Sequence, residues 1–430
     1  MKFLAIDAEI PRLRVGWKRI RFKAAFKPSE RRAGRASVQR LSLSSMGYLY
    51  PREGSSDRQQ ASDSTIARSL LVTPGQLVIN PMWLTGGSVS VSGHSGAVSP
   101  DYRVFNVDPM VEPRFAHFVL RSRPYMKQYA LFVRANTTFD RRVQQDDIDS
   151  MPLLLPEREE QRRIADFLDD RVSRIDHIIA ARREQATLVT ESSSRLSYDC
   201  IRGAIIEGER RRCRLDWLGS VPQTWPVVSV DSQFTVELGK MLDDKRQTGE
   251  HRLPYLRNTN VQWDEISVDD LKEMDIPTVE YSRYTVDAGD LLICEGGKPG
   301  RSAIWMGAIR PIGFQKALHR ARSRGRSSPQ WLLECLRVAV DLDVFIAGTG
   351  QTTIAHLTNE QLREQRFPFP EPQIQMALLQ ELNEKRHDMK HVIAGLARSN
   401  DLLAQYKSSL ITAAVTGELD VTTAGSGIPG

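Results

Sequence analysis

The feature that most constrains this chain is a long segment that occurs twice. Residues 157–203 align with residues 371–417 without a gap, at a constant offset of 214. Ten of the 47 aligned positions are identical, among them Gln161 with Gln375 and Gly203 with Gly417. Long internal repeats reflect repeated structural units. Because the offset is close to half of the 430 residues, the sequence indicates a duplication of the whole chain.

Each copy has the pattern of one long amphipathic helix. A proline-bearing run that ends at Pro156 or Pro370 is followed by an acidic residue, which is typical of a helix start. The glycine that closes each copy stands where a C-terminal cap is expected. A helix this long has an apolar stripe that needs a partner, so we expect the two copies to pair. The alternative is two separate surface helices, each packed on its own domain. The apolar positions at helical spacing are Ile164, Leu168, Ile175 and Ile179 in the first copy and Leu378, Leu382, Met389 and Ile393 in the second.

Composition places few limits on the partner of the chain. The length allows two to three domains, and a 40% hydrophobic content is enough for real cores. A net charge of +6 with a pI near 9.1 weakly favours an acidic partner such as nucleic acid. No window of eighteen apolar residues predicts a membrane span, and charge interrupts the N-terminal stretch too early for a signal peptide. We therefore expect a cytoplasmic protein with reduced thiols. Its cysteines, which lack metal-ligand spacing, are Cys200, Cys213, Cys294 and Cys335.

The segments that precede the two helices are only weakly alike. Short strand-like runs stand among Gly, Ser and Pro residues, which predicts compact, loop-rich α+β units. Trp17 corresponds to Trp225, but at an offset of 208. Two scaffolds of one shape are therefore expected to present two different surfaces. The landmarks at the offset of 214 are Gly75 with Gly289, Leu77 with Leu291, Ile79 with Ile293 and Gly86 with Gly300.

Motif-like strings give no catalytic constellation. The run 80–83, Asn-Pro-Met-Trp, is similar to the Asn-Pro-Pro-aromatic loop of amino-methylating enzymes, but it lacks the second proline. No glycine-rich cofactor loop follows a strand in the required context. The run 296–302 has the residues of a phosphate cradle in the wrong order, and Pro299 breaks the helix start that a Walker loop needs. His94, His319 and His356 have no partner at metal-ligand spacing.

Five strings of the sequence resemble the specificity (S) subunit of type I restriction-modification systems. They are PLLLPEREEQRRIADFLD from Pro152, FPFPEPQIQMALLQELN from Phe367, SSLITAAVTGELDV from Ser408, GDLLICEGGKPGR from Gly289 and GTGQTTIAHL from Gly348. The resemblance covers essentially the whole chain. The first half departs from it at residues 136–138, which replace a glycine-rich turn, and at residues 197–199, which differ from residues 411–413.

The resemblance implies two α/β target-recognition domains, residues 1–156 and 209–370, in an α+β fold. Two long antiparallel coiled-coil helices, residues 157–208 and 371–420, would separate them in a pseudo-twofold duplication, with a flexible tail at 421–430. Each domain would read one half of an asymmetric, bipartite target in double-stranded DNA. Since each half carries one recognition domain and one helix, residues 1–208 alone are expected to dimerise through the helix that normally pairs with its copy.

The resemblance also implies partners and a division of chemistry. The helix pair would dock two methylation subunits, and restriction subunits would complete the complex. The chain itself would be non-catalytic and bind no cofactor or metal, since S-adenosylmethionine, ATP and Mg²⁺ would be held by the partner subunits. Two alternatives remain open, a stand-alone DNA methyltransferase and a coiled-coil scaffold with two protein-binding modules.

Candidate DNA contacts are polar residues in loops of the two recognition domains. Base edges are read by Arg, Lys, Asn, Gln, Ser and Thr, and phosphates are held by Arg and Lys. In the first domain these residues are Asn80, Ser88, His94, Tyr102, Asn136, Thr137 and Thr138. In the second domain they are Lys298, Arg301, Gln315, Lys316, Gln351, Thr352 and Thr353.

Overall fold

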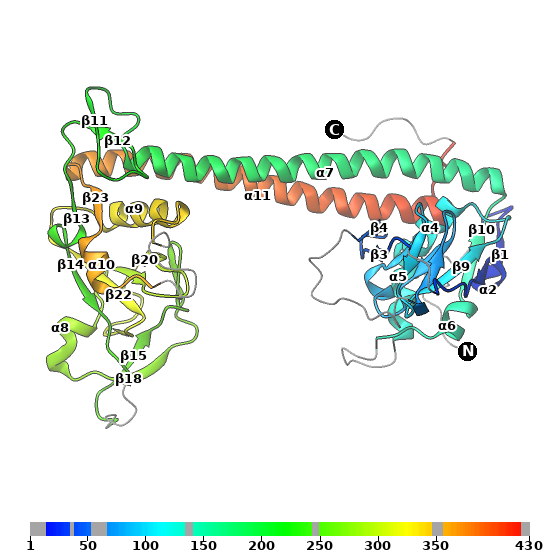
Figure 1. Ribbon diagram of the computed structural model, residues 1–430, viewed down its shortest axis with the longest axis horizontal. Coiled ribbons are helices and arrows are strands. Elements are labelled where there is room, and N and C mark those ends of the chain that lie inside the picture. The colour runs from blue at the N-terminus through cyan, green and yellow to red at the C-terminus, as the bar shows by residue number, and fades with distance from the viewer. Residues whose placement is uncertain are drawn as a thin grey trace. The chain divides into compact units, whose positions relative to one another are not determined.

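The computed structural model describes residues 14–34, 38–52, 67–133, 141–242, 249–345 and 356–422 (Figure 1). The chain divides into two compact units. Unit 1 contains residues 1–183 and 397–430, and unit 2 contains residues 184–396. Each unit therefore holds a segment of both long helices, α7 (Arg158–Ile201) and α11 (Pro372–Thr416). Helices and strands are mixed in both units, so the expected α+β class is confirmed.

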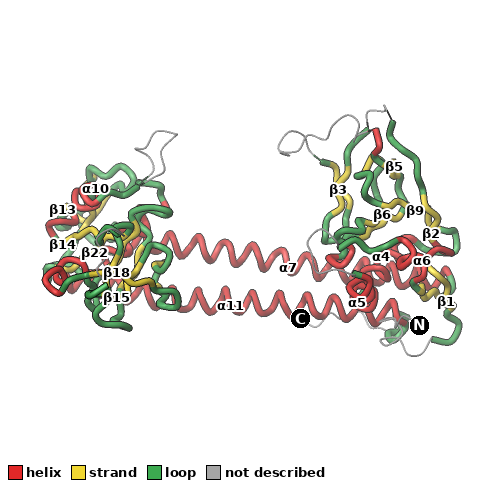
Figure 2. Tube along the Cα trace, turned by 90° about the horizontal axis from the view of Figure 1, so that it is seen from below, coloured by secondary structure: helices red, strands yellow, loops and turns green. Residues whose placement is uncertain are grey.

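Unit 1 is built around a four-stranded antiparallel sheet in the order β2-β9-β6-β7. The strands β2, β9 and β6 run side by side in Figure 2. The strands of this unit are β1 (Lys18–Arg21), β2 (Phe26–Pro28), β3 (Leu41–Leu43), β4 (Leu49–Pro51), β5 (Leu70–Val72), β6 (Leu77–Ile79), β7 (Val89–Val91), β8 (Gly96–Val98), β9 (Arg103–Val107) and β10 (Pro152–Leu155). Its shorter helices are α2 (Phe22–Ala25), η1 (Leu84–Gly86), α4 (Pro113–Arg121), α5 (Arg123–Phe132) and α6 (Gln145–Ser150).

Unit 2 contains a four-stranded antiparallel sheet with the equivalent order, β14-β22-β19-β20. A second sheet, β18-β15-β21, adds a part for which unit 1 has no three-stranded counterpart among its described residues. The strands are β11 (Arg210–Arg212), β12 (Ser220–Pro222), β13 (Val227–Ser229), β14 (Phe234–Leu238), β15 (Arg252–Leu256), β16 (Val261–Gln262), β17 (Glu265–Ile266), β18 (Lys272–Asp275), β19 (Leu291–Cys294), β20 (Ser302–Ile304), β21 (Gly313–Phe314), β22 (Leu318–Ser323) and β23 (Arg366–Pro368). Its shorter helices are η2 (Val230–Ser232), η4 (Thr278–Glu280), α8 (Tyr281–Tyr284), α9 (Pro329–Asp341) and α10 (Asn359–Glu364).

A buried glutamine fixes the start of each long helix. Gln161, 1% exposed, donates to the carbonyl of Pro156 over 2.9 Å and accepts from the amide of Glu112 over 2.8 Å. Gln375, fully buried, donates to the carbonyl of Pro370 over 2.7 Å and accepts from the amide of Ser328 over 2.9 Å. Since Glu112 and Ser328 are the N-caps of α4 and α9, this side chain joins two helix starts in each unit. The glutamine of the repeat therefore has a structural role.

The helix ends also match the repeat. Gly203 has a φ of +61°, and its amide donates to the carbonyl of Cys200 over 3.0 Å, while Ala204 donates to Asp199 over 2.8 Å. These two bonds form a Schellman cap, which requires the left-handed conformation that glycine adopts easily. A Cβ at Gly203 would come within 2.6 Å of the Trp225 ring. A long helix over each copy of the repeat is confirmed, but α7 ends at Ile201 and α11 at Thr416, seven and four residues before the expected ends at 208 and 420.

The two tryptophans that the sequence related to each other have equivalent surroundings. Trp17 meets Phe115 of α4 edge-on, with ring centroids 6.4 Å apart. Trp225 meets Trp331 of α9 edge-on at 5.9 Å. Because α4 and α9 both begin with a proline, Phe115 and Trp331 hold the same position in their helices. Trp17 and Trp225 therefore pack against equivalent positions of α4 and α9.

Within each unit the segments of α7 and α11 contact each other in antiparallel order. In unit 1, Lys407 Nζ lies 2.6 Å from the carboxylate of Asp176. In unit 2, Arg386 donates to Ser197 Oγ over 2.6 Å, and the Cys200 thiol faces the carbonyl of Leu378 at 3.8 Å. No helix in the described ranges combines the length and apolarity needed to cross a membrane.

Candidate nucleic-acid interface

Two loops that carry candidate residues meet in unit 2. Residues 295–301 join β19 to β20, and residues 315–317 join β21 to β22. The amide of Glu295 donates to the carbonyl of Ala317 over 3.0 Å, which ties these two loops together. The amide of Leu357 donates to the carbonyl of Glu295 over 2.8 Å. The chain that follows residues 346–355 therefore returns to the same place.

The candidate side chains of these loops fall into two groups. Lys298 and Lys316 are exposed, so their ammonium groups can reach a phosphate. Arg301 is partly buried and donates to the carbonyl of Asn258 over 2.8 Å, so it holds its loop to the segment before β16. Gln315 is also partly buried, and its backbone N–H donates to the backbone carbonyl of residue 256 over 2.9 Å. The candidates Gln351, Thr352 and Thr353 lie outside the described residues.

Unit 1 has an equivalent loop junction. Residues 80–88 join β6 to β7, as residues 295–301 join β19 to β20. The amide of Val143 donates to the carbonyl of Pro81 over 3.1 Å. Both partners stand 214 residues before the pair Leu357 and Glu295, so the same backbone bond occurs in both units. The candidates Asn136, Thr137 and Thr138 lie outside the described residues.

The described candidates of unit 1 are mostly buried. Asn80 is 8% exposed and Ser88 is 3% exposed. The side-chain oxygen Oδ1 of Asn80 accepts from the backbone amide of Met82 over 3.1 Å, so this side chain shapes the turn after β6. Burial raises the pKa of Tyr102, whereas Arg52 and a hydrogen bond with Asn80 act to lower it. The structure thus brings Asn80 and Tyr102 together, and among these described candidates only His94 is well exposed.

Exposed aromatic side chains of unit 1 were missed in the sequence. Trp83 is 56% exposed at the end of the Asn-Pro-Met-Trp run. Tyr48 and Tyr50 are 56% and 43% exposed, with ring centroids 5.8 Å apart. Their alternation with buried Leu49 was the available signal, because alternate residues of a strand share a face. Aromatic rings at such positions can contact exposed bases or sugars.

A buried histidine supports the loop junction of unit 2. His319 lies on β22, is fully buried, and has Nε2 2.7 Å from the carbonyl of Leu357. Burial lowers its pKa, so the ring is neutral near pH 7. A carbonyl oxygen only accepts, so Nε2 carries the proton and donates it. The ring therefore fixes Leu357 beside the loop that contains Lys298.

Comparison with solved structures identifies the fold. A chain from a study of complex assembly and conformational transition of the type I R-M system aligns with a TM-score of 0.69 at 16% identity, over 95% of this chain and 100% of its own. The HsdS subunit from Thermoanaerobacter tengcongensis aligns with a TM-score of 0.56 at 15% identity, over 95% and 98%. The chain has the fold of a type I restriction-modification S subunit. Sequence comparison found no matching family model and no matching curated protein.

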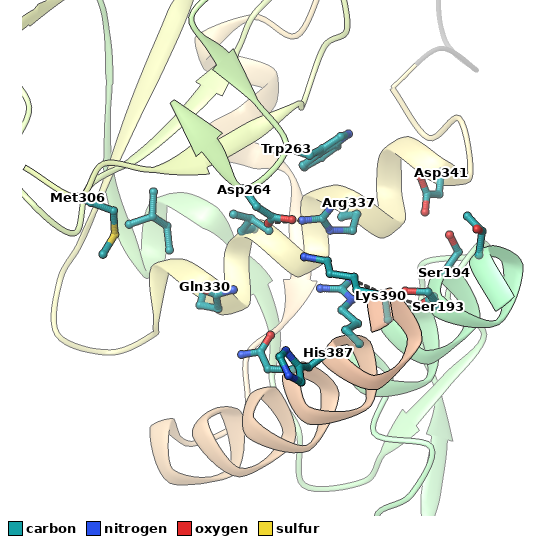
Figure 3. A pocket seen from close by; sticks show the side chains of 16 residues that line it. Ser193, Ser194, Trp263, Asp264, Met306, Gln330, Arg337, Asp341, His387 and Lys390 are labelled. Atoms are coloured by element: carbon teal, nitrogen blue, oxygen red, sulfur yellow. Dashed lines mark hydrogen bonds and ion pairs between the residues drawn. The ribbon is translucent and has the colours of Figure 1, made fainter. Parts of the chain in front are cut away.

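In this S-subunit fold, unit 2 has a polar cleft of about 590 Å³ (Figure 3). It is lined by α7, α9, α11 and the turn between β16 and β17. Figure 3 shows Arg337 beside Trp263, with its guanidinium carbon 4.6 Å from the ring centroid. Arg337 also lies 2.5 Å from the carboxylate of Asp264. These paired charges hold the β16–β17 turn against α9.

The cysteine thiols of this S-subunit fold are shielded from solvent. The four cysteines are free and buried. Burial raises the pKa of Cys200 to about 12 and also raises the pKa of Cys294. Thiols of this kind are protonated near pH 7 and react poorly as nucleophiles. No group of three or more His, Cys, Asp or Glu residues that could hold a metal ion is found among the described residues.

Proposed function

We propose that the chain is the sequence-specific DNA-recognition subunit of a type I restriction-modification complex. The domains 1–156 and 209–370 each read one half of an asymmetric, bipartite target in double-stranded DNA. The helix segments 157–208 and 371–420 arose by internal duplication, pair as an antiparallel coiled coil and act as the spacer between the half-sites. From residue 423 on, the tail expected at 421–430 lies outside the described residues. A rigid spacer fixes the gap between half-sites, as dimer geometry does in other DNA readers.

The observation that carries this proposal is the loop junction present in both units. The bonds from Val143 to Pro81 and from Leu357 to Glu295 involve backbone atoms only. The backbone of the loop junction is therefore alike in the two units, while the side chains around it differ. Lys298 and Lys316 then bind phosphates in unit 2, and the polar residues of the loops read bases. Two loop junctions with a similar backbone and different side chains suit two different half-sites.

The partners are proposed from the fold. One of the similar structures belongs to a study of complex assembly in a type I R-M system. We assign to this chain the corresponding role of docking two methylation subunits and the restriction subunits. The adenine methylation and the DNA cleavage, with S-adenosylmethionine, ATP and Mg²⁺, then belong to those partners. The purified chain alone is expected to show neither DNA methylation nor ATP hydrolysis.

Salt-dependent binding to a DNA duplex of random sequence tests the DNA interface. Replacing Lys298 and Lys316 together with alanine should weaken binding. The slope of log K against log salt concentration should become shallower by about 0.9 for each phosphate that the variant no longer neutralises. The control is Lys385→Ala, because Lys385 forms an ion pair with Glu381 inside α11, 2.6 Å away. An unchanged slope in the double variant would remove these loops from the DNA interface.

A further inference from the structure

The contacts between α7 and α11 differ chemically between the two units. Unit 1 contains α7 up to residue 183 and α11 from residue 397, whereas unit 2 contains the remaining parts. Since the repeat relates position n of α7 to position n+214 of α11, each contact of unit 1 has a counterpart in unit 2. In the counterpart, the two helices exchange roles. The residues at equivalent contacts can therefore be compared directly.

The first difference is an ion pair near the surface. In unit 1, Lys407 of α11 lies 2.6 Å from Asp176 of α7. The counterparts in unit 2 are Ser193 of α7 and Lys390 of α11. Both line the cleft described above, and Figure 3 labels both. A lysine and an aspartate in unit 1 are thus replaced by a serine and a lysine in unit 2.

The second difference is a buried polar cluster in unit 2. Glu334 of α9 is fully buried, and Arg386 of α11 donates to its two carboxylate oxygens over 2.5 and 2.7 Å. The same guanidinium donates to Ser197 Oγ of α7 over 2.6 Å. Ser197 Oγ in turn donates to the carbonyl of residue 193 over 3.1 Å. This cluster therefore joins three helices, and Arg337 of α9 lies a further 3.6 Å from the Glu334 carboxylate.

The same three positions are apolar in unit 1. The long helices are related by the offset of 214, and α4 is related to α9 through their first residues, Pro113 and Pro329. The counterparts of Glu334, Arg386 and Ser197 belong to one apolar core of unit 1. These counterparts are Phe118, Val172 and Ile411.

We propose that these differences form a pairing code, by which α7 accepts α11 of this chain and rejects a second copy of itself. If two copies of α11 paired, Lys407 of one would face Lys390 of the other, which is a repulsive contact. Ile411 would take the place of Ser197, so Arg386, whose side chain is 15% exposed, would have one hydrogen-bond acceptor fewer. The ion pair with Glu334 remains, but a partly buried donor that loses its acceptor is costly, and single buried polar residues can specify which helices pair.

Pairing of two copies of α7 is also unfavourable, because both contacts of unit 1 would lose their partners on α11. Ser197 would take the place of Ile411 and lie against Val172 in an apolar core. Asp176 would face Ser193 of the other copy in place of a lysine. The expectation that residues 1–208 dimerise treats the two helices as interchangeable, and the pairing code predicts that they are not. This inference deepens the proposed function, because it states which helix segments can form the spacer.

The test uses the full-length chain with a protease site inserted between Glu207 and Glu209, both of which are exposed. The purified protein is cut, unfolded and refolded, and the pairing of its halves is measured by native mass spectrometry. We expect pairs of different halves to exceed pairs of identical halves at least about tenfold. Random pairing would give equal amounts of pairs of different halves and pairs of identical halves, and this result would overturn the proposal. Because DNA is absent, this result is independent of DNA recognition, which the uncut protein tests separately by duplex binding.

A variant that copies the residues of unit 1 into unit 2 should abolish the preference. Its five substitutions are Ser193→Lys, Ser197→Ile, Glu334→Phe, Arg386→Val and Lys390→Asp. The halves of this variant should re-pair at random. The control Lys385→Ser removes an ion pair that lies within α11 and should leave the pairing unchanged. A strong preference for different halves in the five-fold variant would show that the code lies elsewhere.

Two substitutions outside the buried cluster test the code even if the refolding fails. In the uncut chain, Ser193→Lys places a lysine against Lys390 and should lower the midpoint of thermal unfolding. Adding Lys390→Asp creates the equivalent of the ion pair between Asp176 and Lys407 and should restore the midpoint. If Ser193→Lys has no effect, or if Lys390→Asp does not rescue it, the two positions do not oppose each other and the proposal is wrong.

Discussion

The amide of Leu357 donates to the carbonyl of Glu295 over 2.8 Å, and the same bond joins Val143 to Pro81 over 3.1 Å in the other unit. In each unit this bond joins a described segment, which starts at residue 141 in unit 1 and at residue 356 in unit 2, to the turn that follows a central strand. Because only backbone atoms take part, the bond persists while Pro81 is exchanged for Glu295 and Val143 for Leu357. Because this bond does not depend on side chains, the sequences of the loops beside it can change without loss of the fold.

Replacement of an exposed aromatic residue should affect DNA binding and not stability. Trp83 is 56% exposed beside the loop junction of unit 1. In Trp83→Ala we expect the affinity for the target duplex to fall by about 1 kcal/mol, because a ring that packs against a sugar or a base edge buries apolar surface on binding. The thermal midpoint should stay within about 1 °C, because surface substitutions change stability little. Met110→Ala, at a side chain that is 48% exposed, is the control. Equal affinity of Trp83→Ala and wild type would exclude a DNA contact for this ring.

Loss of a buried glutamine should destabilise the second unit. In Gln375→Leu, the carbonyl of Pro370 and the amide of Ser328 lose their partner. Because a buried group without a partner costs about 1–3 kcal/mol, the free energy of unfolding should fall by at least about 2 kcal/mol. Gln373→Leu, at an exposed position two residues earlier, should have little effect. Urea unfolding of the two variants measures the difference, and equal stabilities would contradict the role assigned to Gln375.

Acid should destabilise unit 1 through one histidine. Burial on α4 lowers the pKa of His117 to about 4 from its ordinary value of 6.5, and the charge of Arg121 acts in the same direction. Between these two values the unfolded chain binds a proton that the folded chain does not. The stability of the fold should therefore fall as the pH decreases from about 6.5 to about 4, and this contribution should level off below about pH 4.

His117→Leu isolates this effect, because the equivalent position of α9 is Leu333 and is buried. Thermal unfolding measured from pH 4 to pH 8 should show a weaker pH dependence in the variant than in the wild type. The control is His177→Leu at an exposed position of α7, which should keep the wild-type dependence. Identical curves for His117→Leu and the wild type would mean that His117 is not the acid-sensitive group.

The two long helices could be predicted because their signals are local in the sequence. Helical spacing, a proline before the start and a glycine after the end are all visible in one window of sequence. Gln161 was visible as an identity with Gln375, although its partners could not be read. The partner at Glu112 lies 49 residues away, and only the folded chain brings its amide to the helix start.

The candidate site was less predictable, because exposure depends on contacts distant in sequence. Asn80 and Ser88 have the polarity of loop residues, yet they are buried against the turn that they form. Arg301 has the charge of a phosphate ligand, yet it is used to hold residue 258. The polar cluster around Glu334 could not be predicted either, because it needs the antiparallel register of α7 and α11 as well as the position of α9.

A change in spacer length should change the gap between the half-sites. Insertion of four residues in α7 alone would shift its register against α11, so the matched insertions follow Ala186 in α7 and Leu396 in α11. Four residues add about 6 Å of helix and keep most of the apolar stripe in phase. At about 3.4 Å per base pair, the preferred gap should grow by one or two base pairs while both half-sites stay the same. An unchanged gap with full activity would show that the helices do not set the distance.

The central claim is that this chain gives a type I complex its bipartite DNA specificity. Its most direct measurement is the mapping of methylated adenines in the DNA of cells that carry the methylation subunit, with and without this chain. We predict methylation only when the chain is present, at one asymmetric motif made of two half-sites with a fixed gap. Methylation that is independent of the chain, or a motif made of a single uninterrupted site, would contradict the account.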